Sequence, residues 1–399
     1  MLPTIRYREL KPANRLYPIT LLVLALIAIV GLAAAHQMDI EGHHISGMTN
    51  QIVWGLPHVF AIFLIVSASG ALNLASISTL FGADHYKPLA RFSAVLAITL
   101  LVGGLSILLL DLGRPDRLIV AMTYYNFKSI FAWNILLYVG FIVIVLAYLW
   151  LMMERSMHRW TKPAGMVAMI WRLILTSGTG SIFGFLVARE AYDSALLAPM
   201  FIVMSFAFGL AITILLLISS FSLDKRNLGN ELLQKLRRLL GVFTAAILYF
   251  VVLFHLTKLY GAGNAGVENF ILFDGGIYTL LFWLVQIGLG SLLPLYLIYS
   301  SRFDDCRNTL VAACLLILLG AFAQLYIIII GGQAFPLNIF PGYIVESSFF
   351  DGVVGQYQPS IYEILLGMGG LAFALLAAIL SLRILPILPD RLADEFTPS

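Results

Sequence analysis

The sequence predicts an all-α integral membrane protein with about ten transmembrane helices. Of its 399 residues, 60% are hydrophobic and only 11% are charged, whereas soluble domains carry roughly 25% charged residues. Ten apolar stretches are long enough to cross ~30 Å of hydrocarbon. Each span must satisfy its own backbone hydrogen bonds in lipid, so we expect helices rather than open sheets.

The ten stretches differ in how clearly each predicts a span. The first follows four basic residues and ends in three alanines, as a secretory signal would. It is nevertheless about 20 residues long, whereas the apolar core of a signal has ~7 to 15, so we expect a retained helix. The fifth is the weakest, because Arg172 and a Ser/Gly/Thr cluster interrupt it. The predicted spans are 17–35, 53–81, 89–112, 130–152, 165–188, 196–221, 239–260, 276–300, 309–330 and 360–385.

The distribution of Lys and Arg predicts the orientation of these spans. With the N-terminus inside, the inner segments and span ends hold 18 basic residues and the outer loops hold 4. Positive charge is enriched on the cytoplasmic side, so we expect both termini to be cytoplasmic. Residues 1–16 and 386–399 would flank one membrane domain, 17–385. The basic stretch 225–238 is most simply part of this topology signal.

The two cysteines limit the redox chemistry of the protein. Cys306 and Cys314 lack the paired CxxC spacing of iron–sulfur and zinc sites. A redox metal would therefore be a haem or belong to a partner, and we expect no metal or haem in this chain.

Six ionisable residues in the spans or at their boundaries fall on the predicted outer side. At membrane depth such groups cost roughly 2.5–3.5 kcal/mol each and are functional candidates by default. Only Arg172 falls towards the inner half. The outer group consists of His58, Asp111, Glu190, His255, Lys258 and Glu363.

This one-sided pattern favours a quinone site near the outer face. A quinone needs an apolar slot, a hydrogen-bond partner for each carbonyl, and groups that exchange two protons, for which a histidine and a partly buried carboxylate are suited. We expect His58 to bond or protonate a quinone oxygen and Asp111 to be its proton partner. The candidate quinone-binding residues are Trp54, His58, Asp111, Arg114, Tyr125, His255, Lys258 and Glu363.

Structural roles compete for several of these residues. The Asp111–Arg114 turn could simply end a helix, with Arg114 paired to Asp111 or Asp116. Lys258 could extend its ammonium outward along the helix. Glu363 could serve the first turn of its helix, where the dipole favours a carboxylate. Trp54 and Tyr125 could belong to an ordinary interfacial aromatic belt.

Two other classes of function remain open from the residues alone. A b-type haem could be held by His58 and His255, because haem between spans is usually bound by histidines from two helices. A secondary transporter could use the glycines at 103–104, 178 and 180 as helix breaks, although transporter sites lie near the midplane, which most of the charged groups avoid.

Several segments resemble one family of membrane proteins. The segments are WGLPHVFAIFLIVSASGALNLAS, LDLGRPDR, FIVMSFAFG, FWLVQIGLGSLLPLYL and LGAFAQLYIIIIGGQ followed by YQPSIYE. In order and spacing they are similar to the NrfD/PsrC family of membrane subunits of quinone-linked oxidoreductases. The ten-helix layout, NFKSIFAWN and FPLNIFPGY look most similar to the family's DsrP group, from a sulfur-metabolism complex.

The resemblance implies two four-helix bundles with flanking helices in a bacterial or archaeal cytoplasmic membrane. It implies a pocket for menaquinone or ubiquinone near the outer face, with His58 and Asp111 at the positions of the family's histidine and acid. It also implies an extracytoplasmic ferredoxin-like iron–sulfur subunit as partner. A multihaem cytochrome c and other membrane redox subunits are further candidate partners, and no nucleic acid is expected. Gln324 stands where many relatives carry an arginine.

Overall fold

The computed structural model describes residues 6–12, 15–80, 82, 84–303, 307–337, 352–390 and 392. Within them, ten helical stretches are long and apolar enough to span a membrane, as predicted. Eight of these spans are α-helical, and one of the eight consists of two consecutive helices. They are α1 (Leu16–Glu41), α2 (Leu56–Ala71) with α3 (Asn73–Leu80), α4 (Ala90–Leu110), α6 (Ile130–Met153), α7 (Thr161–Gly184), α8 (Leu197–Leu223), α9 (Asn230–Tyr260) and α15 (Ile361–Ile384).

The other two spans contain π-helical segments. One runs from α11 (Ile277–Leu280) through η7 (Leu281–Leu292) to α12 (Leu293–Tyr299). The other runs from α13 (Arg307–Tyr326) through η9 (Ile327–Gly331) to α14 (Gly332–Ala334). These π segments widen the helix locally, which the sequence did not predict.

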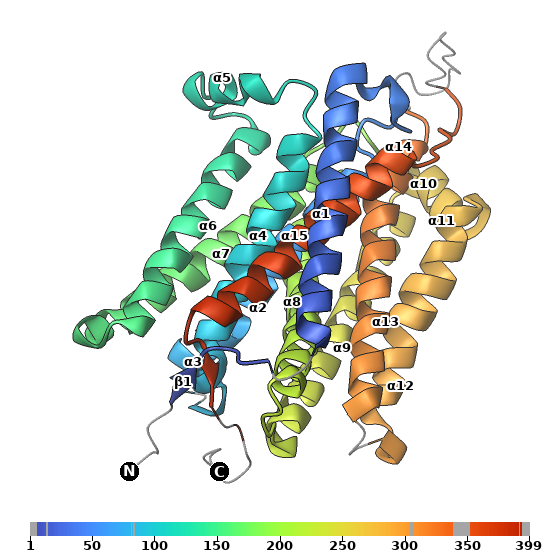
Figure 1. Cartoon of the computed structure of the whole chain (residues 1–399). Helices are drawn as coiled ribbons and strands as arrows, with labels where there is room; N and C mark the ends of the chain where they lie inside the picture. The colour runs from blue at the N-terminus through green and yellow to red at the C-terminus, as the bar shows by residue number, and fades with distance from the viewer. Residues whose placement is uncertain are drawn as a thin grey trace.

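The spans pack as two four-helix bundles with a flanking pair (Figure 1), as the resemblance implied. The first bundle consists of α2–α3, α4, α6 and α7, and the second of α8, α9, α11–α12 and α13–α14. The two bundles meet where α8 packs against α2 and α7. Helix α15 lies against α4 and α2 of the first bundle, and α1 packs on α15.

Small residues allow the bundles to approach closely. A Cβ atom added at Gly70 of α2 would overlap the Ser205 carbonyl oxygen of α8, and one added at Gly209 would overlap the Gly70 backbone. Glycines at helix crossings serve this purpose in membranes, where dispersion contacts rather than the hydrophobic effect hold helices together.

The two termini meet at one end of the molecule (Figure 1). Strand β1 (Tyr7–Arg8) pairs antiparallel with β2 (Leu388–Pro389). The buried Asp224 carboxylate, just after α8, forms an ion pair with Arg226 at 2.6 Å and accepts from the Lys11 backbone N–H at 3.2 Å. The structure therefore places both termini on one face, and their cytoplasmic location stays a prediction.

Short helices cover the opposite end, which we call the distal end. They are η1 (His43–Ile45), η3 (Pro115–Arg117), α5 (Leu118–Thr123), η5 (Ala262–Asn264), α10 (Ala265–Asn269) and the π segment η6 (Phe270–Asp274). The termini end has η2 (Asp84–Leu89), η4 (Arg155–Trp160) and η8 (Ser301–Phe303). Much of the distal connection 331–359, including most of FPLNIFPGY, lies outside the described residues.

Candidate functional site

A histidine and a buried carboxylate face each other at the distal end of the first bundle. His58 lies in the first turn of α2, where Pro57 favours the start of the helix,. Asp111 caps the C-terminal end of α4, which packs against α2. His58 Nδ1 lies 3.0 Å from Asp111 Oδ2, and the side chains are 24% and 1% exposed, respectively. Only the histidine is therefore accessible from outside.

The Asp111 carboxylate has unused hydrogen-bonding capacity. Among the described residues, neither of its oxygens has a hydrogen-bond partner, and the close contact with His58 Nδ1 lacks hydrogen-bond alignment. A buried carboxylate without donors is costly. The pair is therefore suited to hold a water molecule or a polar group of a ligand.

Aromatic rings line the neighbourhood of His58. The Trp54 ring centroid lies 6.4 Å from that of His58, 5.6 Å from Phe183 and 6.4 Å from Tyr192. The Gln333 side-chain amide holds the backbone of Trp54 in place. It accepts from the Trp54 backbone N–H at 3.0 Å and donates to the Trp54 backbone carbonyl at 3.0 Å. Trp54 thus lies beside His58, and its role in a quinone site stays a prediction.

Two further residues fix this region, and the sequence did not single them out as site residues. Arg189 donates to the Gln333 carbonyl at 2.9 Å and to the Gln51 carbonyl at 2.7 Å, and burial lowers the pKa of Arg189. Tyr192 donates to the Ile329 carbonyl at 2.7 Å, and burial raises the pKa of Tyr192, so it stays a neutral donor. The sequence feature that could have indicated them is an arginine and a tyrosine close together in the short connection between α7 and α8.

Arg114 and Tyr125 lie apart from the His58–Asp111 pair. Arg114 is paired with Asp116 at 2.8 Å, with 63% of its side chain exposed, and its hydrogen bond lowers the pKa of Asp116. Of the two partners open to Arg114, the structure favours Asp116. Tyr125 donates to the Ala132 carbonyl at 2.5 Å, and its ring lies 4.9 Å from that of Phe127.

Lys258 and Glu363 are held by the protein itself. The Lys258 ammonium donates to the Glu190 carbonyl at 2.6 Å and the Asp193 carbonyl at 3.2 Å. Glu363 is fully buried and forms a capping box with Ser360 at the start of α15.

The Glu363 carboxylate also ties two distal loops to α15. It accepts from the Gly47 N–H at 2.7 Å and from the Tyr357 hydroxyl at 2.7 Å. Burial, with this carboxylate alongside, raises the pKa of Tyr357. Lys258 and Glu363 thus have the contacts of structural residues.

A second histidine–carboxylate pair lies in the second bundle. His255 Nδ1 of α9 is 2.7 Å from Glu268 Oε2 of α10, and the side chains are 12% and 1% exposed. The sequence predicted that His255 belongs to one cluster with His58, whereas the structure places them in different bundles, each facing its own carboxylate. Glu268 was missed; it lies with Asp274 in the connection after the seventh predicted span.

These features define a class: a ten-span helical membrane protein with two bundles, each carrying a buried histidine–carboxylate pair at the same end. The chain belongs to the NrfD family, since residues 44–337 match the family described as "Polysulphide reductase, NrfD". The matched residues run from η1 to α14 and contain both bundles.

Named relatives extend this comparison. The chain is 27% identical to the "Hdr-like menaquinol oxidoreductase integral membrane subunit" of Archaeoglobus fulgidus, over 98% of each protein. It is 26% identical to a selenate reductase subunit of Mesobacillus selenatarsenatis, over 92% of this chain and 93% of that one. It is 25% identical to one of the polypeptides of the polysulfide reductase of Wolinella succinogenes, over 72% of this chain and 96% of that one.

Proposed function

We propose that this chain is the membrane-anchoring, quinone-reactive subunit of a multi-subunit redox complex. The observation that carries the proposal is the His58–Asp111 pair, whose buried carboxylate has spare hydrogen-bonding capacity beside a partly exposed imidazole and a ring-lined wall. Relatives named as parts of a menaquinol oxidoreductase and of a polysulfide reductase support it.

In this proposal His58 and Asp111 handle the protons of the quinone. Oxidising a quinol to a quinone releases two protons and two electrons. Asp111 faces Nδ1 of His58, which leaves Nε2 to accept the two quinol protons in turn, because the partly exposed ring passes the first proton to water before it takes the second. The carboxylate then stabilises the positively charged imidazole, as an opposite charge within ~4–6 Å does. In the reverse direction the pair gives protons to the reduced ring.

The two electrons leave to a redox partner, which we place on the distal end. The two cysteines cannot form an iron–sulfur ligand set,, so the partner supplies the acceptor. A ferredoxin-like iron–sulfur subunit is our candidate, and a multihaem cytochrome c and other membrane subunits are further ones. We propose menaquinol as the substrate because of the name of the Archaeoglobus relative. The closer likeness to the DsrP group and a role in sulfur metabolism stay predictions.

An Asp111→Asn variant tests this mechanism without removing the side chain. We expect quinol-driven reduction of the partner in the purified complex to fall by about 10²-fold or more, the usual contribution of a positioned acid or base. His36→Gln, on the exposed part of α1, is the matched control and should keep full activity. Unchanged turnover in Asp111→Asn would remove Asp111 from the mechanism.

A further inference from the structure

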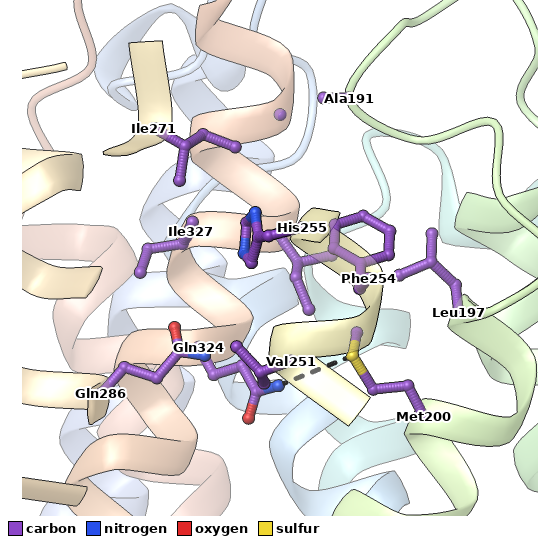
Figure 2. Close-up of a pocket in the computed structure, with 12 residues that line it drawn as sticks. Ala191, Leu197, Met200, Val251, Phe254, His255, Ile271, Gln286, Gln324 and Ile327 are labelled. Atoms are coloured by element: carbon purple, nitrogen blue, oxygen red, sulfur yellow. Dashed lines mark hydrogen bonds between the residues drawn. The ribbon is translucent and has the colours of Figure 1, made fainter. Parts of the chain in front are cut away.

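His255, whose imidazole is paired with Glu268, lines a small cavity in the second bundle (Figure 2). His255 extends towards the middle of this cavity, with the Gln324 and Gln286 amides on its other side. Phe254 and Val251 of α9 contribute apolar walls. The mechanism proposed for His58 and Asp111 uses none of these residues.

Three π-helical segments contribute to the walls of this one cavity. Ile271 comes from η6, Gln286 from η7, and Ile327 and Ile328 from η9. The π-helix is rare, and where it occurs it is frequently found at functional sites. Three π-helical segments line the same cavity, which indicates that the backbone of the second bundle is adapted to form it.

Spare hydrogen-bonding capacity is found both on the Glu268 carboxylate, which is paired with the cavity residue His255, and on an amide that lines the cavity. Glu268 is 1% exposed, and its Oε1 atom has no hydrogen-bond partner among the described residues. The amide nitrogen of the buried Gln324 has a weak contact, 3.9 Å, with the Met200 sulfur. Buried groups of this kind normally bind ordered water when no protein partner is present.

The size of the cavity identifies what it can hold. Its volume is about 30 Å³, whereas pockets for small organic ligands have roughly 300–1,000 Å³. A water molecule needs only about 10–15 Å³ on the same measure. The cavity therefore has room for one or two water molecules and excludes a quinone ring.

We propose that His255, Glu268 and the water in this cavity form a second proton-exchange site, separate from the His58–Asp111 pair. One proton enters the pair and one leaves it, and no electrons move. The other charged groups nearby are Lys258, one turn further along α9, and Glu190 and Asp193 in the loop against it. The carboxylates of Glu190, Asp193 and Glu268 each interact with the Lys258 ammonium. The effect on turnover described below rests on the proposed function, whereas the protonation itself does not.

Infrared difference spectra test the protonation without any turnover. The quinone-free protein in lipid nanodiscs is measured between about pH 5 and about pH 8, where histidine titrates. We expect a histidine and carboxylate signal in the wild type and in His36→Gln, and its loss in both His255→Gln and Glu268→Gln. Identical spectra in wild type and both variants would overturn the proposal.

Turnover of the complex provides a second readout. We expect Glu268→Gln to retain its bound quinone and its thermal stability, to turn over at least tenfold more slowly, and to show a larger solvent deuterium isotope effect. Glu268→Asp should recover part of the rate. Turnover within twofold of wild type, or a slow variant that is also unstable with an unchanged isotope effect, would instead assign the pair a structural role. If wild type binds no quinone, the proposed function fails and the infrared result still decides this site.

Discussion

Four buried carboxylates separate into two kinds at the scale of single residues. Asp224 accepts a backbone hydrogen bond and forms an ion pair with Arg226, and Glu363 accepts three hydrogen bonds, so both connect segments of the protein. Asp111 and Glu268 each face one histidine and keep at least one oxygen without a partner among the described residues. Since an unpartnered buried carboxylate is costly, the second kind marks the places where a proton, a water or a ligand is expected.

Glu363 allows this distinction to be tested. Glu363→Ala leaves three donors without their acceptor, those of Gly47, Tyr357 and Ser360. We expect the free energy of unfolding to fall by about 2–4 kcal/mol, because the Glu363 half of the capping box is lost and buried donors are left unsatisfied. Thermal unfolding in mild detergent measures this, with the exposed Glu41→Ala as control. Full stability with loss of bound quinone would return Glu363 to the quinone site.

Arg114 provides a test at the surface. The pKa of Asp116 is lowered by Arg114, so the pair forms above the ordinary aspartate pKa of about 3.9 and is lost only as the pH falls below that range. At neutral pH we expect Arg114→Gln to change quinol turnover by less than about twofold, because exposed ion pairs contribute little. A pH–turnover profile measures this. A large loss at neutral pH would mean that Arg114 acts on Asp111 or the substrate.

Sequence reasoning found His58, Asp111 and His255 because charge is rare in apolar spans. It could not tell which carboxylate each histidine faces, since that depends on how α2 meets α4 and how the backbone folds back after α9. Glu268 was missed for this reason. Lys258 and Glu363 stood out by the same rule. The Ser360–Glu363 spacing is that of a capping box, whereas the contacts of Lys258 with backbone carbonyls and of Glu363 with Gly47 depend on the tertiary fold.

At the scale of helices, the crossing of α2 and α8 joins the two bundles. Gly209→Val would push its side chain into the backbone at Gly70, and overpacking of this kind costs about 1–3 kcal/mol or more. We expect a lower temperature of unfolding and a loss of bound quinone. Gly263→Ala, whose Cβ would meet nothing within 4 Å, is the control. Equal stability of the two variants would show that the bundles separate easily at this crossing.

The ten spans were predictable because the length and hydropathy of a span depend only on neighbouring residues in the sequence. Their grouping into two bundles came from the family resemblance alone. The π-helical segments in α11–α12 and α13–α14 were not predicted, because the shift from one hydrogen-bonding pattern to another depends on packing against α9 and on the cavity between them.

The whole molecule has one end that joins the termini and one end that carries both histidine–carboxylate pairs (Figure 1). The excess of basic residues predicts that the termini end is cytoplasmic. In a variant without Cys306 and Cys314, an impermeant maleimide applied to intact cells should label Gly263→Cys and leave Lys11→Cys unlabelled until the cells are opened. The reverse labelling would place both pairs on the cytoplasmic side.

The most direct measurement is the quinone content of the complex purified in mild detergent, together with its redox difference spectrum, for wild type and His58→Ala. We predict that bound quinone is present in wild type and lost in His58→Ala, that His36→Gln retains it, and that no haem band arises from this protein. Bound quinone that persists in His58→Ala, or a haem band that disappears with His58, would contradict the assignment of His58 as the residue that binds the quinone.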